Sequence, residues 1–511
     1  MSLTKKWHWA VIGLFTGLLI LAAFWYIYAS AQQRTARHLD FIHNAIDAMH
    51  PAILETDATA FHDWHINGYQ KARELLPLVH TTADETALLR LYTAGYRDPH
   101  LNGYLDKKPY SKLDAKEDLW AGWLLKVSNS GYEVIYRKNG DAYPPVHAML
   151  TSCDGQPIDE LLHKHYAPYF DIRWQILAAR DKAAKAFTQD RLFTGILTRP
   201  ELVSCDFLVD NTTKTYRVIW SPISQNESDV IAIKSNTPYT FPSITEVAQN
   251  KLWIRASDFA LHTPEAAQHQ KNLLAKLESI KDKEWVVLDM RGNDGGNSFH
   301  GFQILSRILD DKDKRYLSIK HERKSPNANA QFRASWPLYW YWSYRLEKLR
   351  ETQGENTQED KNINHLLTKL KVALDTGETH FNQVDAPPGI IESPDEIPQW
   401  KSNIKLVLIT DKVCVSACLD LVDAIKLIPN TLHVGEPTDA DTVYTEIARM
   451  QSKYLEETYN FMVPVKKWNK RLREDNQPYI PDVIYEGDMN DDKALEQWTL
   501  AQVEQHFSTI Q

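Results

Sequence analysis

The sequence lacks the motifs that most directly assign an enzyme's chemistry. There is no HExxH among its nineteen histidines, and neither GxGxxG nor GxxxxGK occurs. Its four cysteines match no zinc-binding spacing, because zinc fingers and ribbons use closely spaced pairs of ligands. The formal charge is −9 and no basic stripe is present, which argues against nucleic acid as a partner. We therefore expect no metal, no other cofactor and no nucleic-acid binding.

The cysteines that are present fall into two even pairs. Cys153 with Cys205 and Cys414 with Cys418 are both compatible with disulfides in an oxidising compartment. The alternative, that they are small buried hydrophobic residues, is equally open from the sequence. A bond between Cys414 and Cys418 would close a small loop around Ser416.

One long hydrophobic run lies near the N-terminus, at Trp9 to Tyr28, preceded by Lys5 and Lys6. Its length and its aromatic ends predict a transmembrane helix with the N-terminus in the cytoplasm. The alternative is a signal peptide cleaved near Ala29-Ser30-Ala31, but the apolar part of a signal peptide is normally ~7–15 residues long. We expect a single-pass anchor in the inner (cytoplasmic) membrane, with the main body extracytoplasmic, in the periplasm.

The length of 511 residues predicts several domains. We expect a cytoplasmic tip and anchor at 1–31, a helical N-terminal domain at 32–116, and a β-rich module with helical insertions at 117–235. That module includes a predicted helix at Asp171–Thr188. An α/β core is expected at 236–511, with a helical insertion at about 325–400. The aromatic-rich part of this insertion, Trp336 to Glu351, is read either as a helix packed on the core or as a lid or membrane-resting face.

The core shows strands that alternate with helices. Apolar, β-branched runs predict strands at Lys251–Ala256, Trp285–Met290, Lys405–Thr410 and Thr431–Val434. Helical periodicity appears at Thr263–Ile280 and from Ala417 to Ile428. This alternation predicts a mainly parallel sheet, whose functional sites gather where the strands end.

Two of these strand ends carry candidate site residues. The strand at Trp285–Met290 runs into a turn with Gly295 and Gly296, where backbone N–H groups can approach a substrate carbonyl closely, as an oxyanion hole requires. The strand at Lys405–Thr410 leads to Ser416, which is either a helix N-cap or a nucleophile. His100 lies in a distant polar turn, either simply solvated or catalytic.

Three of these pieces together resemble the C-terminal-processing (tail-specific) and tricorn-type serine peptidases. WVVLDMRGNDGGN (Trp285–Asn297) is similar to the family's strand and D-[LM]-R-x-N-x-G-G turn. Ser416-Ala417 is followed nineteen residues later by Gly435-Glu436-Pro437-Thr438, and Tyr96 to His100 resembles the family's D-G-H turn. Weaker matches are Thr151–Leu162, similar to part of a PDZ-like module, and Pro481-Asp482. The resemblance implies a Clp-protease/crotonase-like α/β core.

The chain departs from the family where the tail-specific members carry a catalytic lysine. Asp441 stands in that position, so the base must come from elsewhere. The tricorn-type members use histidine, and His100 occupies the matching turn. In those members a glutamate helps complete the site, for which Glu474 is the best-placed candidate, with Asp475 next to it. The resemblance thus implies Ser416, His100 and Glu474 as catalytic residues, with Ala417 and Gly295 or Gly296 binding the oxyanion.

We therefore predict a membrane-anchored, extracytoplasmic serine endopeptidase that acts through an acyl-enzyme on a peptide or protein, which the PDZ-like module would grip at its C-terminus. The missing lysine motivates an alternative, an inactive peptide-binding or scaffolding pseudoprotease. A third interpretation, acyl-transfer or hydratase chemistry on a crotonase-type core, ranks last because no residues suggest a coenzyme A pocket.

Overall fold

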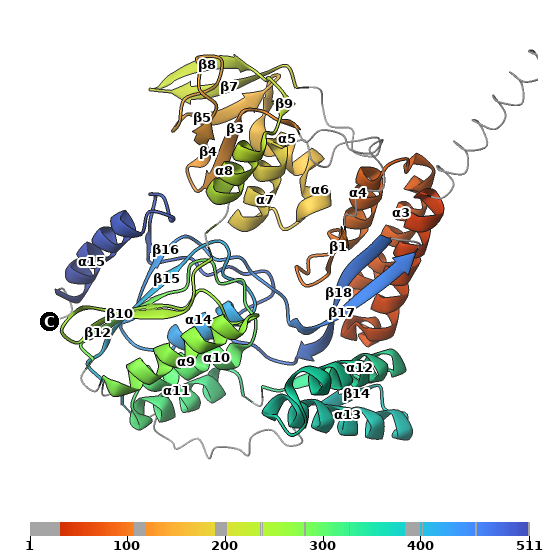
Figure 1. Cartoon of the computed structure of the whole chain (residues 1–511), viewed down its shortest axis with the longest axis vertical. Helices are drawn as coiled ribbons and strands as arrows, with labels where there is room; N and C mark the ends of the chain where they lie inside the picture. The colour runs from red at the N-terminus through yellow and green to blue at the C-terminus, as the bar shows by residue number, and fades with distance from the viewer. Residues whose placement is uncertain are drawn as a thin grey trace, which may run out of the picture.

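The computed structural model describes residues 31–106, 119–189, 202–235, 237, 239–280, 283–326, 328–383, 399–400, 402–454 and 457–508. The chain is a mixed α/β protein with three large β-sheets, each covered by its own helices (Figure 1). The central sheet belongs to the predicted α/β core. In Figure 1 the sheet with β3, β4 and β7 lies above it, and the sheet with β17 and β18 lies to its right.

The central sheet confirms the predicted strands of the core. Its order is β10 (Ser243–Ala248), β11 (Lys251–Arg255), β12 (Trp285–Asp289), β15 (Lys405–Thr410), β16 (Leu432–Gly435) and β19 (Val483–Ile484). All neighbours are parallel except β10, which pairs antiparallel with β11 at the edge. Because the strands are buried on both faces, they appear in the sequence as continuous apolar runs.

Helices cover both faces of this sheet. On one face lie α9 (Pro264–Ser279), α10 (Ser298–Ile308) and α14 (Ala417–Ile425), packed against residues such as Val286 and Leu288. The opposite face, with Trp285 and Val287, packs on α15 (Asp492–Ser508). A further helix, α11 (Asp311–Lys324), follows α10. Because β12, β15 and β16 are adjacent and parallel, the glycine turn, Ser416 and the loop after Gly435 meet at one edge.

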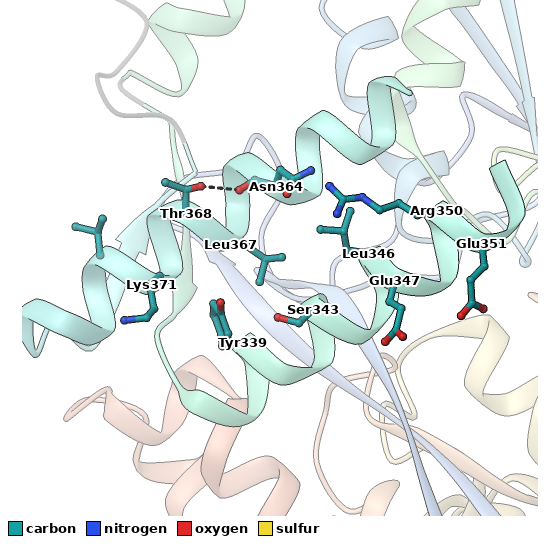
Figure 2. Close-up of a pocket in the computed structure, with 11 residues that line it drawn as sticks. Tyr339, Ser343, Leu346, Glu347, Arg350, Glu351, Asn364, Leu367, Thr368 and Lys371 are labelled. Atoms are coloured by element: carbon teal, nitrogen blue, oxygen red, sulfur yellow. Dashed lines mark hydrogen bonds between the residues drawn. The ribbon is translucent and has the colours of Figure 1, made fainter. Parts of the chain in front are cut away.

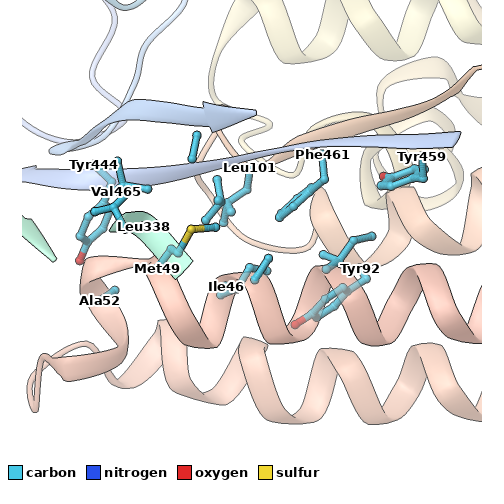
Figure 3. Packing of buried hydrophobic residues seen from close by; sticks show 14 of the residues in the cluster. Ile46, Met49, Ala52, Tyr92, Leu101, Leu338, Tyr444, Tyr459, Phe461 and Val465 are labelled. Carbon is cyan, nitrogen blue, oxygen red and sulfur yellow. The ribbon is translucent and has the colours of Figure 1, made fainter. Parts of the chain in front are cut away.

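The second sheet joins segments that are far apart in the sequence. It contains β1 (Asn102–Asp106), β18 (Glu457–Trp468), β13 (Ala330–Arg333) and β14 (His380–Asn382), and β17 (Tyr444–Tyr454) pairs with β18. Its apolar face packs on the N-terminal helices, and Figure 3 shows Phe461 and Val465 of β18 facing this helical layer.

The N-terminal region is helical from residue 31 to 49 and continues through a series of short helices. These are η1 (Pro51–Leu54), α2 (Thr59–Asp63), η2 (Trp64–Gly68), α3 (Tyr69–Leu75), η3 (Leu76–Leu78) and α4 (Thr82–Thr93). The predicted helical segment ends earlier than expected, since Asn102–Asp106 forms β1. Gly103 and Leu105 alternate inward there and pair with β18, a long-range contact that overrides local helical preference.

The aromatic-rich insertion forms a hairpin of α12 (Trp336–Gln353) and α13 (Gln358–Thr376). Leu338 and Trp342 on one face of α12 are buried in the same cluster as the N-terminal helices, so this face packs on the body of the protein. Trp336, Trp340 and Tyr344 on its other face are exposed.

The β-rich module contains a six-stranded antiparallel sheet with helices on it. The strands are β3 (Trp123–Ser128), β4 (Gly131–Arg137), β5 (Met149–Cys153), β7 (Ser204–Val209) and β8 (Thr212–Arg217), with β6 (Gln156–Pro157) paired to β5. Helices α5 (Ile158–His165), α6 (Ala167–Phe170) and α7 (Leu177–Phe187) contribute to its core. A two-stranded pair, β2 (Leu119–Trp120) with β9 (Ser221–Pro222), and α8 (Gln225–Ser235) complete this part.

Both predicted cysteine pairs form disulfides. Cys153–Cys205 links β5 to β7, and Cys414–Cys418 closes a loop at the start of α14. The predicted transmembrane anchor, Trp9–Tyr28, lies outside the described residues. Within the described residues, no helix combines the length and the apolar character that crossing a membrane requires.

Candidate active site

Ser416 lies between β15 and α14 in a backbone conformation that is unusual for a residue with a side chain. Its φ is 58° and its ψ is −121°, a region that costs of order 1–3 kcal/mol and is often found at functional sites. Ser416 occupies the N-cap position of α14, yet its side chain makes no capping hydrogen bond. The disulfide between Cys414 and Cys418 encloses it. The simpler interpretation of this serine as a helix cap is therefore wrong.

The glycine turn after β12 packs directly against Ser416. A Cβ atom added to Gly295 would lie 2.9 Å from Ser416 Cβ and 3.0 Å from the Val415 carbonyl oxygen. Gly295 has a φ of +105°, which residues with a side chain rarely adopt. This position therefore requires glycine, and it brings the turn into contact with the loop that carries Ser416.

The backbone donors of this turn differ in availability. The N–H of Gly295 donates to Asn293 Oδ1 at 3.0 Å, whereas the amides of Gly296 and Ala417 have no acceptor among the described residues. Asn293 in turn donates from Nδ2 to the Ala256 carbonyl. Of the three predicted oxyanion donors, Gly296 and Ala417 thus keep a free N–H, and Gly295 makes the close approach possible.

Replacing Gly295 by alanine is expected to lower kcat by about 10²-fold or more, because displacing the turn takes the Gly296 N–H away from the oxyanion, and the loss of one such donor has about this effect. The new methyl group would push the turn away from Ser416, because both nearest atoms are within 3.0 Å. Gly354→Ala is the matched control, since Gly354 also has a positive φ but no atom lies within 4 Å of its added Cβ. Peptide-hydrolysis kinetics check this prediction, and equal losses in the two variants would contradict it.

His100 lies in the turn between α4 and β1 and is buried beside Asp98. Its Nδ1 is 3.3 Å from Asp98 Oδ1, and its backbone N–H donates to the same oxygen at 3.0 Å. Burial alone would lower the pKa of His100. The close contact with Asp98 and its charge, together with the charge of Asp441, outweigh burial and the opposing charge of Arg173, so the pKa of His100 is raised.

Asp98 itself is held in its charged form. Burial would raise the pKa of this carboxyl, but the neighbouring imidazoles of His100 and His50 outweigh burial and lower it. The second histidine, His50, comes from the N-terminal helical region, and its Nε2 is 3.8 Å from Asp98 Oδ2. Asp98 was absent from the predicted site, although it is part of the same Tyr96–His100 turn.

Asp441 connects the surroundings of His100 with the helix that begins after Ser416. Arg473 binds both oxygens of Asp441, at 3.0 Å from Nε and 3.0 Å from Nη2. The same Nη2 also lies 3.0 Å from Asp420 Oδ1, one turn into α14 from Ser416. Burial raises the pKa of Asp441 to about 6, and Asp420 adds to this while Arg473 and His100 oppose it. The arginine was not predicted as a site residue.

His100 and Ser416 themselves are not hydrogen-bonded to each other. Within the described part of the chain, neither the imidazole Nε2 nor the serine Oγ makes a hydrogen bond. Catalytic hydrogen bonds are often long or poorly aligned without substrate and tighten in the complex. Neither group is therefore paired. The Asp441–Arg473–Asp420 network links the surroundings of His100 to α14, the helix that follows Ser416.

Glu474 does not contribute to this network. Its side chain is exposed and forms neither a hydrogen bond nor an ion pair with any described residue. Its neighbour Asp475 accepts a hydrogen bond from the Val443 N–H at 2.8 Å. Burial, together with the charges of Asp98 and Asp441, raises the pKa of Asp475 to about 6. The carboxylate in contact with His100 is therefore Asp98.

Charged contacts hold the β-rich module against the loops of this site. Arg173 donates to Asp439 Oδ1 at 3.1 Å and to the Ala440 carbonyl, next to Asp441. Lys412, four residues before Ser416, lies 2.7 Å from Asp181 on α7. Two loops that border the site are thus bonded to the module.

A groove of about 920 Å³ lies elsewhere, between α12 and α13 of the insertion (Figure 2). Leu346, Leu367 and Tyr339 line it together with charged residues such as Arg350 and Lys371. None of its lining residues belongs to the predicted site.

Comparisons with known proteins identify a family match and a similar fold. Residues 252–483 match the model of peptidase family S41. A structure of mature CPAF complexed with lactacystin is similar at a TM-score of 0.57 and 13% identity, covering 94% of this chain and 99% of that chain. A second structure of mature CPAF has a TM-score of 0.54 at 12% identity, covering 90% and 93%. At such identities the likeness shows the fold alone. A search of curated proteins gives no match.

Proposed function

The chain belongs to peptidase family S41 and is a serine-type peptidase, and from this premise we propose that it is an endopeptidase with Ser416 as nucleophile and His100 as general base. The observation that carries the proposal is the conformation of Ser416. It adopts a strained φ of 58° at a strand-to-helix turn, without a capping bond, beside a glycine turn with a free N–H. A strained turn of this kind presents a nucleophile to substrate.

The reaction begins with the transfer of the Ser416 hydroxyl proton to Nε2 of His100 as Oγ attacks the carbonyl carbon of the peptide. The N–H groups of Ala417 and Gly296 stabilise the oxyanion of the tetrahedral intermediate. Its collapse breaks the C–N bond, and the imidazolium returns the proton to the leaving amine. Water, deprotonated by the same imidazole, then releases the acyl group from Ser416.

Asp98 is assigned the positioning role that the resemblance to tricorn-type members implied for Glu474. Its contact with Nδ1 keeps the proton on that nitrogen and leaves the lone pair of Nε2 free to accept from Ser416. Asp441, which occupies the position of the family's lysine, adds negative charge near His100. The imidazolium formed during the reaction is stabilised by both carboxylates.

The wider organisation of the molecule is part of the same proposal. The chain is proposed to have four parts, at 1–31, 32–116, 117–235 and 236–511. The first is a membrane anchor, and the other three are extracytoplasmic. The hydrophobic run at Trp9–Tyr28 and the two disulfides support this location. The module at 117–235 is proposed to be PDZ-like and to grip a substrate's C-terminus.

The test is the digestion of a denatured protein mixture by the purified full chain and by its Ser416→Ala variant, with new termini identified by mass spectrometry. We expect cleavage at internal peptide bonds by the wild type and none by the variant. Peptide binding without turnover in both proteins would instead support the pseudoprotease alternative, which the unpaired state of His100 and Ser416 favours.

A further inference from the structure

The carboxylate beside the catalytic base has a second histidine on its other side. Asp98 lies between His100, whose Nδ1 is 3.3 Å from Oδ1, and His50, whose Nε2 is 3.8 Å from Oδ2. The side chains of Asp98 and His50 are completely buried. Among the described residues, His50 Nε2 and His100 Nδ1 make no hydrogen bond, and the only carboxylate within 4 Å of either nitrogen is that of Asp98. Both nitrogens therefore depend on this one carboxylate.

The tautomer of His50 follows from a hydrogen bond on its other ring nitrogen. The backbone N–H of Ala52 donates to His50 Nδ1 at 3.1 Å. Since an amide N–H is always the donor, Nδ1 must be the acceptor and carries no proton. The neutral ring then has its proton on Nε2, the nitrogen that faces Asp98. Burial lowers the pKa of His50, against the charge of Asp98, which keeps the ring neutral.

The ring is also fixed in place by the elements around it. It stacks on Phe61 with ring centroids 4.5 Å apart and lies 4.7 Å from the ring of Tyr444. Arg333 of β13 donates to the His50 carbonyl at 3.1 Å. Figure 3 labels Met49, Ala52 and Tyr444 where the helical layer meets β17. With its ring packed against Phe61 and Tyr444 and its backbone carbonyl bonded to Arg333, His50 has little freedom to turn away from Asp98.

We propose that His50 is a positioning residue, whose Nε2–H faces Asp98 from 3.8 Å and orients it toward His100, so that the N-terminal helical region forms part of the catalytic machinery. This inference rests on the proposed function of Ser416 and His100. It adds a fourth member, His50, to a Ser–His–Asp arrangement, supplied by a part of the chain outside the residues that match the family.

Other charged groups that face these residues bear on the pH dependence. Asp441 and Arg173 act on His100, and Glu55 and Arg333 act on His50. Asp98 is also close to the charged or polar groups of three further residues: Tyr96, Arg173 and Asp475. None of the substitutions below changes these groups, so differences between the variants report on the contact between His50 and Asp98.

Two substitutions separate positioning from a merely structural role. His50→Asn keeps an oxygen that can accept from the Ala52 N–H but is too short to reach Asp98. His50→Gln places an amide N–H near the position of Nε2 and loses the acceptor at Nδ1. We expect His50→Asn to lower kcat about 10-fold to 100-fold, by analogy with the cost of removing the outer partner of a metal-binding histidine, and His50→Gln to restore much of that loss.

The acid limb of kcat/KM gives a second readout. When Asp98 is less firmly held, it stabilises the protonated form of His100 less, so the limb of His50→Asn should move to lower pH than in the wild type. His38→Asn is the matched control, because His38 Nε2 is also 3.8 Å from a buried carboxylate, Glu85, within the same helical region. We expect its acid limb to stay in place.

The outcomes separate the inference from the proposed function. If the wild-type full chain neither hydrolyses peptides nor reacts with a fluorophosphonate, the proposed function fails. If the wild type is active but His50→Asn keeps its rate and acid limb, or loses no more than His50→Gln, the inference is overturned. Should His50→Asn fail to fold, the ring itself is measured in the wild type by ¹⁵N NMR. A neutral Nε2–H tautomer is expected at pH 7, and an Nδ1–H tautomer would overturn the inference.

Discussion

Replacing His100 by alanine is expected to reduce kcat for peptide hydrolysis on the order of 10⁶-fold, as for the loss of the histidine in other serine peptidases. A serine hydroxyl near its free pKa is a poor nucleophile, and His100 is the imidazole whose Nδ1 is held by a carboxylate, 3.3 Å away. The same residue must protonate the leaving amine, so its loss affects both chemical steps. Steady-state kinetics of the purified full chain would measure the effect.

The control for this variant is His365→Ala, because His365 is an exposed histidine on α13 and should keep the wild-type rate. Residues that act as one unit are strongly non-additive. The double variant Ser416→Ala/His100→Ala should therefore be no slower than either single variant. If the two losses multiplied, or if His100→Ala retained most of the wild-type rate, His100 would not be the base for Ser416.

Replacing Asp98 by asparagine is expected to lower kcat by roughly 10⁴-fold, as when the triad aspartate of a serine peptidase is changed in this way. The amide would present an N–H to the ring and favour the wrong tautomer of His100. It also removes the main group that raises the pKa of His100. Because His100 must be neutral to accept a proton, activity falls as the pH drops through this pKa.

The loss of Asp98 should shift the pH dependence of hydrolysis toward acid. In the wild type the acid limb of the pH profile of kcat/KM should lie above the ordinary histidine pKa of about 6.5, and in Asp98→Asn it should move to lower pH. Glu85→Gln is the matched control, since Glu85 is also a buried carboxylate that faces a buried histidine, but that histidine is His38 and not His100. A rate close to that of the wild type with an unchanged limb in Asp98→Asn would contradict the assignment.

The strands and helices of the core could be predicted from the sequence because their signals are local. Buried parallel strands appear as apolar runs, and α9 (Pro264–Ser279) follows a Thr263 cap and Pro264 at its first turn. The predicted helix at Asp171–Thr188 begins later, at Leu177. There the Asp171 carboxylate accepts from the Arg173 N–H at 3.1 Å and binds its guanidinium, which holds the chain in a turn.

The site was predictable only in the parts that carry a motif. Ser416 and the glycine turn follow strands and lie at the sheet edge as expected. The partners of His100 depend on contacts between distant segments, such as His50 with Asp98 and Arg473 with Asp441. Nothing in the local sequence indicates such pairs. The position of Glu474 in the chain matches the family's glutamate, but position alone does not predict which carboxylate contacts His100.

The measurement that tests the central claim most directly is the position of a covalent label. The purified full chain is treated with an active-site-directed fluorophosphonate and the modified peptide is identified by mass spectrometry. The account predicts a single adduct on Ser416, formed faster as the pH rises through the pKa of His100 and much more slowly in His100→Ala. An adduct on another serine, or no adduct from a chain that still hydrolyses peptides, would contradict it.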